Sequence, residues 1–296
     1  MREFREVMER ECCRAIMIQE YEYTRFDLLV RLAAQLRIPA YATFQGGDRT
    51  LSWVEKRVRK FSMKACAGLI IASSAERARV EQVYRHSHPE IARISNPLDC
   101  DEWRAIPRAT ARNLLGLSSE VFIAIEHCRI DIWRKGLDVL IDAWSSSRDG
   151  KLVIIGSGQD REAFTHMLSE HNVSNVQWID GYTTDRQLIR NWLSAADVYV
   201  MASRVEGMPV APLEAMACGL AVIATDAQGL PDILSEGENS GGILVPRENA
   251  TALAAAIDRV RSSAELREKL GRAARVRVES AFSIPAVGNA LRIFLG

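Results

Sequence analysis

The sequence predicts an α/β protein made of two Rossmann-like, doubly wound domains, the first of them incomplete. Short apolar runs typical of strands alternate along the chain with longer segments whose apolar residues recur at helical spacing. A polar, proline-containing stretch at residues 96–112 interrupts this alternation and has the composition of an interdomain linker. The chain has 296 residues, of which 48% are hydrophobic, enough for two cores. Repeated β-α-β order predicts parallel sheets with helices on their faces.

The first half is predicted to contain four strands joined by helices. A charged segment at residues 2–11 predicts a short helix or a frayed lead-in. Strands are expected at 14–19, 39–44, 69–72 and 91–95, and helices at 25–36, 51–65 and 74–85. A doubly wound sheet of the common kind has about six strands. We therefore expect a first domain that lacks strands and helices ahead of Met1.

The second half is predicted to be a complete doubly wound domain. Its strands are expected at 121–127, 151–156, 176–179, 198–201, 221–225 and 242–245. Its helices are expected at 136–146, 159–170, 185–195, 210–218, 249–260, 263–281 and 284–295. We predict domains at residues 1–103 and 104–283, with a C-terminal helix at 284–296 that crosses back to the first domain.

The composition argues against several classes of protein. Lys plus Arg equal Asp plus Glu at 38 each, and nucleic-acid-binding domains usually carry a basic excess. The six cysteines have no paired spacing, so neither a disulfide framework nor a metal site is indicated. No apolar run reaches the roughly 18 residues of a membrane span, and the charged N-terminus lacks a signal-peptide core. We therefore predict a cytoplasmic protein that does not bind nucleic acid.

Residues 203–219 carry the first functional signal. This stretch, S-R-V-E-G-M-P-V-A-P-L-E-A-M-A-C-G, follows a predicted strand and enters a predicted helix, with Pro209 and Pro212 near the helix start. The amides and dipole of such a helix terminus favour anions. Glu206 and Glu214 flank the turn and would instead bind hydroxyl groups. A ligand with both phosphates and sugar hydroxyls, a nucleotide-sugar, fits this combination.

Two cations after the first strand of the second half would suit a diphosphate. Arg129 and Lys135 bracket the loop before the helix at 136–146. Arg134 competes for the same role, and the alternative is a solvated charged loop. After the next strand, Gly156-Ser157-Gly158 predicts a tight turn that allows close backbone approach.

Together these motifs resemble a retaining glycosyltransferase of family 4, the glycogen-synthase-like group with the GT-B fold. The resemblance rests on Arg129 with K-G-L-D at 135–138, on the V-I-I-G-S-G strand and turn at 153–158, and on the block at 203–225. In the first half, residues 19–27 and 43–48 look like a subgroup of this family, and the N-P-L-D at 96–99 looks like its hinge.

The resemblance implies a hexosyltransferase that uses a UDP- or GDP-sugar, retains the anomeric configuration and requires no metal. By position, Arg129 and Lys135 would stabilise the diphosphate, Glu206 would lie near the sugar and Glu214 would bind the ribose hydroxyls. Contacts from the backbone would come from Gly207, Met208, Pro209 and Val210. The loop at 181–182 is where we expect base recognition. The acceptor, a glycan, a lipid or a small molecule, is left open.

Two departures from the family pattern bear on activity. Gln45 occupies the place where many members carry a histidine near the transferred sugar, and the glycine-rich acceptor-side loop of the family is absent, as expected for an N-terminally truncated member. One alternative is therefore a non-catalytic remnant that binds nucleotide-sugars. A second is an NAD-type oxidoreductase, suggested by Gly156-x-Gly158 followed by Asp180, although Arg161 replaces the third glycine.

The segment at 51–65 predicts an amphipathic helix with a basic side. Its apolar residues are Leu51, Val54, Val58, Phe61 and Ala65, and its basic residues are Lys56, Arg57, Arg59, Lys60 and Lys64. Such a helix favours peripheral contact with an anionic membrane. The alternative is an ordinary crossover helix with a solvated basic face.

Overall fold

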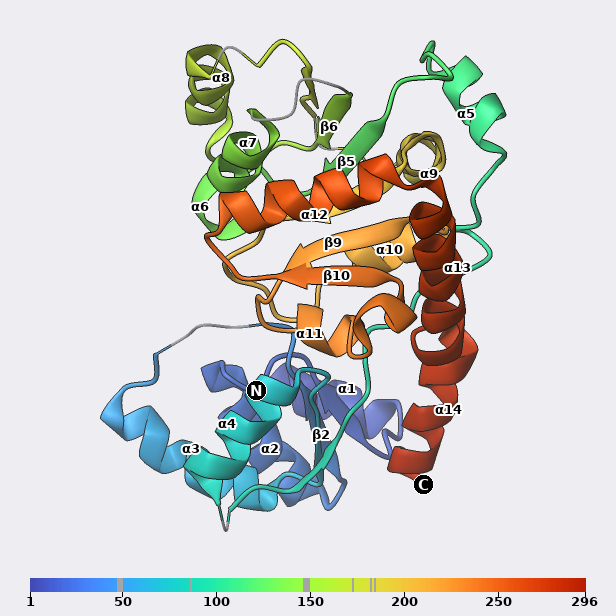
Figure 1. Cartoon of the computed structure of the whole chain (residues 1–296). Helices are drawn as coiled ribbons and strands as arrows, with labels where there is room; N and C mark the ends of the chain where they lie inside the picture. Colours follow the sequence, from blue (N-terminus) through green and yellow to red (C-terminus); the bar gives the residue numbers. More distant parts are fainter. Residues whose placement is uncertain (47–49, 86, 146–149, 172, 182, 184) are drawn as a thin grey trace. The chain divides into compact units, whose positions relative to one another are not determined.

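The computed structural model describes residues 1–46, 50–85, 87–145, 150–171, 173–181, 183 and 185–296 (Figure 1). The chain divides into two compact units, Met1–Asn96 with Ala290–Gly296, and Pro97–Asn289. Both units contain a parallel sheet connected by helices, as the β-α-β order predicts. The domain limits expected from the sequence, 1–103, 104–283 and 284–296, remain predictions.

In the described part of the first unit, four parallel strands run in the order β1-β2-β3-β4. They are β1 (Ile16–Ile18), β2 (Ala40–Thr43), β3 (Gly68–Ile70) and β4 (Glu90–Ala92). The helices are α1 (Arg2–Arg10), α2 (Thr24–Leu36), α3 (Trp53–Ala65) and α4 (Ser74–Tyr84). The four strands and four helices predicted for this half are all present. Phe26, Leu69 and Val80 belong to one buried core between these elements.

The orientation of α3 differs from the predicted one, in which the basic face is solvated. Arg59, expected among the solvated residues, is fully buried, whereas Val54, Val58 and Phe61 are exposed. The guanidinium of Arg59 donates to both carboxylate oxygens of Asp27 at 2.9 Å, and further to backbone carbonyls of residues 21–23. Burying an arginine is tolerated because its donors find partners. The apolar stripe is thereby left on the outside.

The second unit contains six parallel strands in the order β10-β9-β8-β5-β6-β7. They are β5 (Ile123–His127), β6 (Lys151–Ile155), β7 (Val176–Ile179), β8 (Val198–Met201), β9 (Ala221–Thr225) and β10 (Gly242–Val245). The longer helices are α7 (Leu137–Ser145), α8 (Arg161–Glu170), α9 (Arg186–Ala195), α10 (Ala211–Ala217), α12 (Ala250–Ser262) and α13 (Ala264–Ala281). All six strands were predicted to within two residues.

The strands of this sheet send alternate side chains to its two faces. Ala124 of β5 and Val198 of β8 belong to the core beneath α7 and α12, which lie side by side across one face (Figure 1). Their neighbours along each strand project to the other face, where His127 stacks edge-on against Tyr199 at 5.5 Å between ring centroids. This alternation decides which side chains of β5 reach which part of the site.

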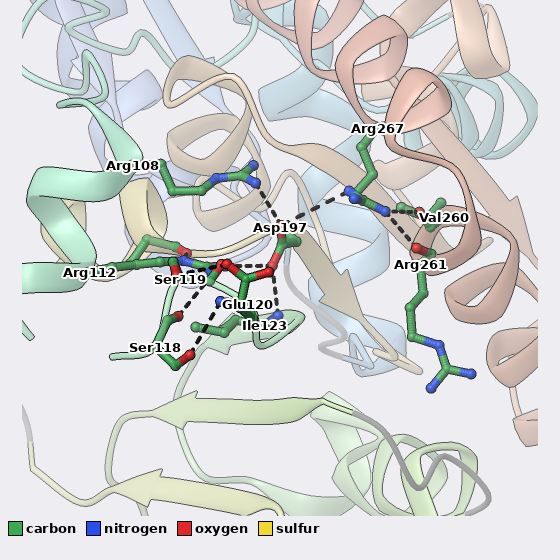
Figure 2. Close-up of polar contacts among 11 residues, drawn as sticks. Arg108, Arg112, Ser118, Ser119, Glu120, Ile123, Asp197, Val260, Arg261 and Arg267 are labelled. Carbon is green, nitrogen blue, oxygen red and sulfur yellow. Dashed lines mark hydrogen bonds and ion pairs between the residues drawn. The ribbon is translucent and has the colours of Figure 1, made fainter. Parts of the chain in front are cut away.

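Four short elements were not predicted. They are α5 (Arg108–Leu114), α6 (Ile132–Lys135), α11 (Leu230–Ile233) and the 3₁₀ helix η1 (Gly237–Ser240). The α5 helix lies inside the stretch interpreted as a linker. It is held by Arg112, which is buried and donates to Asp197 at 2.8 Å and to three backbone carbonyls. Figure 2 shows Arg108, Arg112 and Arg267 converging on this one carboxylate.

The last helix, α14 (Ile284–Leu295), belongs to both units, since its final residues are grouped with the first. Within that unit the ring of Phe294 lies 5.7 Å from that of Tyr41. A Cβ on Gly68 would lie 2.4 Å from the ring of Phe294, so glycine is needed there for the helix to approach the strand closely. Within the described residues, none of the helices is sufficiently long and apolar to span a membrane.

Candidate functional site

The strand order of the second unit marks a place for a ligand. The chain adds β6 and β7 on one side of β5, and β8, β9 and β10 on the other, so the order reverses between β5 and β8. In doubly wound sheets, ligands bind outside the carboxyl ends of the strands at such a reversal. The predicted site residues lie in the segments that follow β5 and β8 and in the helices those segments enter.

A pocket of about 690 Å³ opens at this edge. Arg129 and Glu214, predicted from separate stretches of sequence, both line it, together with the turn at residues 156–158. The other lining residues are Trp103, His127, Cys128, Ile155, Gly181, Thr183, Asp185, Arg186 and Ile189. Its volume lies within the range of about 300–1,000 Å³ that is usual for small-molecule sites.

Two glycines allow the loops around Arg129 to pack closely. A Cβ on Gly156 would lie 1.9 Å from the carbonyl oxygen of Cys128, and one on Gly158 would lie 2.1 Å from that of Ile130. The turn after β6 therefore touches the backbone on both sides of Arg129. The predicted close approach at this turn is present, and it supports the loop that carries the cation.

Lys135 and Glu206 form an ion pair, with 2.5 Å between Nζ and Oε1. The same carboxylate oxygen accepts a hydrogen bond of 2.7 Å from the hydroxyl of the buried Ser203. Gly136 follows Lys135 with φ of +60°, and a Cβ there would lie 2.1 Å from the carbonyl oxygen of Ala202. The end of α6 thus packs against the end of β8, which brings the two charges together.

Glu214 is held by a histidine that the sequence analysis did not single out. Its Oε2 lies 2.6 Å from Nε2 of His127, the last residue of β5. Glu214 lies in the first turn of α10, and its carboxylate faces the pocket that both residues line.

The residue before His127 is also ionisable. Glu126 is fully buried, and within the described structure its carboxylate oxygens have no hydrogen-bond partner other than the adjacent thiol of Cys128. Burial raises the pKa of its carboxyl to about 8, with the nearby charge of Lys135 lowering it and that of Glu206 raising it. Burial likewise raises the pKa of the Cys128 thiol. Strand alternation places Glu126 and His127 on opposite faces of the sheet, His127 beside Glu214 and Glu126 near the charges of Lys135 and Glu206.

The remaining predicted residues are placed as follows. Gly207, Met208 and Pro209 are buried in the loop before α10, whereas Val210 is 37% exposed. Arg134, the alternative cation, lies in α6, where its carbonyl oxygen accepts the amide of Arg204. Gly181 lines the pocket, and Tyr182 lies outside the described residues.

Sequence reasoning missed Glu126, His127 and Arg204. The first two were assigned only to a buried strand. Two ionisable residues at the end of the apolar run I-A-I-E-H could have indicated that they belong to a site. Arg204 donates to both carboxylate oxygens of Asp138, at 2.8 and 2.7 Å, and to Glu248 at 2.9 Å. It thereby ties the 203–210 loop to α7. No spacing rule indicates that link.

Across the described residues, no group of three or more His, Cys, Asp or Glu side chains is arranged to hold a metal ion. The expectation that the reaction needs no metal is a separate statement about chemistry and stays a prediction.

The fold and the site define a doubly wound α/β protein with a pocket of mixed charge at the strand-order reversal. A family model for glycosyl transferases group 1 matches residues 116–277, which include every predicted site residue. The chain belongs to this family.

Relatives with known activities support the same assignment. The chain is 31% identical over 255 residues to an alpha-maltose-1-phosphate synthase of Mycobacterium tuberculosis, an alignment covering 80% of this chain and 64% of the relative. It is 31% identical over 229 residues to a D-inositol 3-phosphate glycosyltransferase of Streptomyces bingchenggensis, covering 72% of this chain and 49% of the relative. The chain thus spans about half to two thirds of the length of these relatives.

Solved structures show the same fold. Sucrose-phosphate synthase from Thermosynechococcus elongatus superposes with a TM-score of 0.81 at 24% identity, covering 98% of this chain and 74% of that one. Anabaena HepE, solved in complex with UDP, has a TM-score of 0.82 at 18% identity, covering 94% and 78%. The fold is the GT-B class of glycosyltransferases, as the resemblance implied.

Proposed function

We propose that this chain carries the donor site of a retaining hexosyltransferase, which moves a sugar from a UDP- or GDP-sugar to an acceptor. The observation that carries the proposal is the pocket at the β5–β8 reversal. It places a cation, Arg129, and a carboxylate, Glu214, on the walls of one cavity whose volume suits a nucleotide. Anions and hydroxyl groups are the two chemistries of a nucleotide-sugar, and the family uses such donors.

Each predicted residue then has a role that its surroundings support. Arg129 borders the pocket and would bind a phosphate through its guanidinium fork. Lys135 would turn from Glu206 to the diphosphate as it binds, and Glu206 would then lie near the sugar. Glu214 would accept hydrogen bonds from the ribose hydroxyls while His127 fixes its orientation. Residues 207–210 would contribute backbone contacts.

The reaction demands mainly positive charge that is already in place. The leaving group is a nucleoside diphosphate, and its negative charge grows as the bond to the sugar breaks. Arg129 and Lys135 would stabilise that charge in the transition state without a metal. We propose retention of configuration because the site residues match those of a retaining family. The acceptor is unassigned among glycan, lipid and small molecule.

The test is a comparison of ligands by calorimetry and of products by mass spectrometry. UDP or GDP, and the matching nucleotide-sugar, are expected to bind, whereas NADH is not. Transfer to any acceptor would establish the enzyme, and donor binding without turnover across an acceptor panel would support the non-catalytic remnant instead. Binding of NADH but of no nucleoside diphosphate would contradict the proposal.

We further propose peripheral membrane contact through α3 of the first unit. Trp53 and Phe61 are 77% and 72% exposed, and Lys56, Arg57, Lys60 and Lys64 flank them. Aromatic side chains beside lysines and arginines suit an anionic bilayer surface, where the rings enter the headgroup region and the cations meet the phosphates. A cytoplasmic location, with this surface at the membrane, remains part of the proposal.

Vesicle co-sedimentation tests this contact. The chain is expected to bind vesicles containing phosphatidylglycerol and to stay unbound with phosphatidylcholine alone. Replacing Trp53 and Phe61 by serine should abolish binding, whereas Val121→Ser, at a partly exposed apolar position of the second unit, should leave it unchanged. Equal binding by the double variant would overturn the proposal.

A further inference from the structure

Glu126 is an anomaly in the described structure. It is fully buried, and in the described structure its carboxylate oxygens have no hydrogen-bond partner other than the adjacent, weakly donating thiol of Cys128. A buried polar group without a strong partner normally destabilises a protein, so its presence calls for an explanation. Its neighbours on β5, Ile125 and His127, face the opposite side of the sheet, where an ionisable side chain does have a partner.

The groups around Glu126 come from three other parts of the site. The charges of Lys135 in α6 and of Glu206 in the loop after β8 both act on its carboxyl group, and the thiol of Cys128 lies beside it at the end of the same strand segment. The buried phenol of Tyr199 on the neighbouring strand β8 is a further ionisable group on which a charge at Glu126 would act. One lysine thus faces two carboxyl groups, and it already forms an ion pair with Glu206 at 2.5 Å. A negative charge on Glu126 would therefore have to share Lys135 with Glu206.

We propose that Glu126 is a positioning residue of the donor site, a buried, neutral carboxylic acid near the Lys135–Glu206 pair whose ionisation weakens nucleotide binding. The inference rests on the proposed donor site. As an acid, Glu126 can donate its proton and still accept a hydrogen bond. It can therefore adapt to the Lys135 ammonium both when the lysine contacts Glu206 and when it contacts a diphosphate.

The sign of the pH dependence follows from this charge state. Below the raised pKa of about 8, Glu126 is neutral and leaves the positive charge of Lys135 to the ligand. Above it, a buried negative charge would repel the diphosphate and compete for the lysine. Nucleotide affinity should therefore fall as pH rises, by up to about tenfold for each pH unit above the pKa.

The experiment is calorimetric titration of UDP against the wild type, Glu126→Gln and Glu126→Met from about pH 6.5 to about pH 9. Both variants are permanently neutral, and two are used in case one fails to fold. The ratio of wild-type to variant dissociation constants at each pH cancels the titration of UDP itself. That ratio is expected to rise by roughly three- to tenfold across the range. Parallel profiles would overturn the proposal.

A second readout does not depend on ligand binding. The infrared difference spectrum between the wild type and Glu126→Gln reports whether this carboxyl is protonated at neutral pH. A protonated carbonyl band that disappears in alkali is expected, and a carboxylate band at pH 7 would contradict the proposal. If no nucleoside diphosphate binds the wild type, the proposed donor site fails, and the infrared result still decides the state of Glu126.

Discussion

Lys135 and Glu206 form an ion pair, with 2.5 Å between Nζ and Oε1. The cation proposed to hold the diphosphate is therefore already engaged, and a nucleotide must take it from Glu206. That competition reduces affinity in the ground state. It also holds the lysine in one position, from which we propose that it responds as charge develops on the leaving group.

Glu206→Gln is expected to bind UDP more tightly than the wild type, because Lys135 loses its competitor while the side-chain shape is kept. We expect a gain of roughly three- to tenfold in affinity, equivalent to about 0.7–1.4 kcal/mol. The same variant should lose transfer activity if Glu206 contacts the sugar. Calorimetry with UDP measures the first effect, and weaker binding would contradict the competition.

Lys135→Ala and Glu214→Ala should both weaken UDP binding, but with different selectivity. Each removes a charge-assisted contact worth about 1.5–3 kcal/mol, or roughly tenfold or more in affinity. Uridine lacks phosphates, so its affinity should fall only in Glu214→Ala. Unchanged UDP affinity in both variants would remove the site assignment, and equal effects of both on uridine would remove the division of roles.

Glu126→Gln is expected to change the pH dependence of stability. The carboxyl is ionised in the unfolded chain above its ordinary value of 4.5, whereas in the folded protein it stays protonated up to about 8. Folding therefore takes up a proton, and the wild type loses stability as pH rises between these values, in total on the order of 5 kcal/mol. The Tm of the variant minus that of the wild type should be larger at pH 8 than at pH 5. The same Tm difference at both pH values would count against a buried acid.

Gly158→Ala should weaken nucleotide binding through the loop that carries Arg129. Its added Cβ would meet the carbonyl oxygen of Ile130 at 2.1 Å, so one of the two loops must move. Gly288→Ala is the matched control, since nothing lies within 4 Å of the added atom there. A UDP titration in which both variants match the wild type would show that the close packing has no role in the site.

Asp197→Ala is expected to destabilise the second unit by about 3–5 kcal/mol, the usual effect of leaving a buried charge without its partner. Arg112, which is only 4% exposed, would lose its counter-ion, and the amide of Ile123 would lose its acceptor (Figure 2). Denaturant unfolding measures the change. As a control, Asp101→Ala removes only an exposed pair with Arg104 and should leave stability within about 0.5 kcal/mol.

Hydrophobic periodicity was sufficient to predict the sheets and most helices, because both sheets are parallel and their strands are buried runs between amphipathic helices. It failed where ion pairs decide the packing. Arg59 occupies the buried face of α3 because Asp27 is available from α2, and α5 forms inside a linker-like stretch because Arg112 reaches Asp197. Neither partner is close in sequence, so no local pattern could reveal them.

The candidate site was likewise predicted only in part. Glu206, Glu214, Arg129 and Lys135 were found because each belongs to a motif with characteristic spacing. His127 and Glu126 were missed because their importance comes from groups that are distant in sequence. His127 pairs with Glu214, and Glu126 lies near the charges of Lys135 and Glu206. Such relationships depend on the pleat and on strand order, which the sequence does not display directly.

The alternation at the end of β5 has a consequence for how such a site could diversify. Consecutive side chains of β5 lie on opposite faces of the sheet, with His127 beside Glu214 and Glu126 near the charge of Glu206. In the proposed donor site, the separation between the ribose end and the sugar end would then depend on the backbone pleat. Loop residues can then vary the choice of sugar or base while the reach of the site stays constant. A change of donor would then require different residues around the pocket, on the same strand framework.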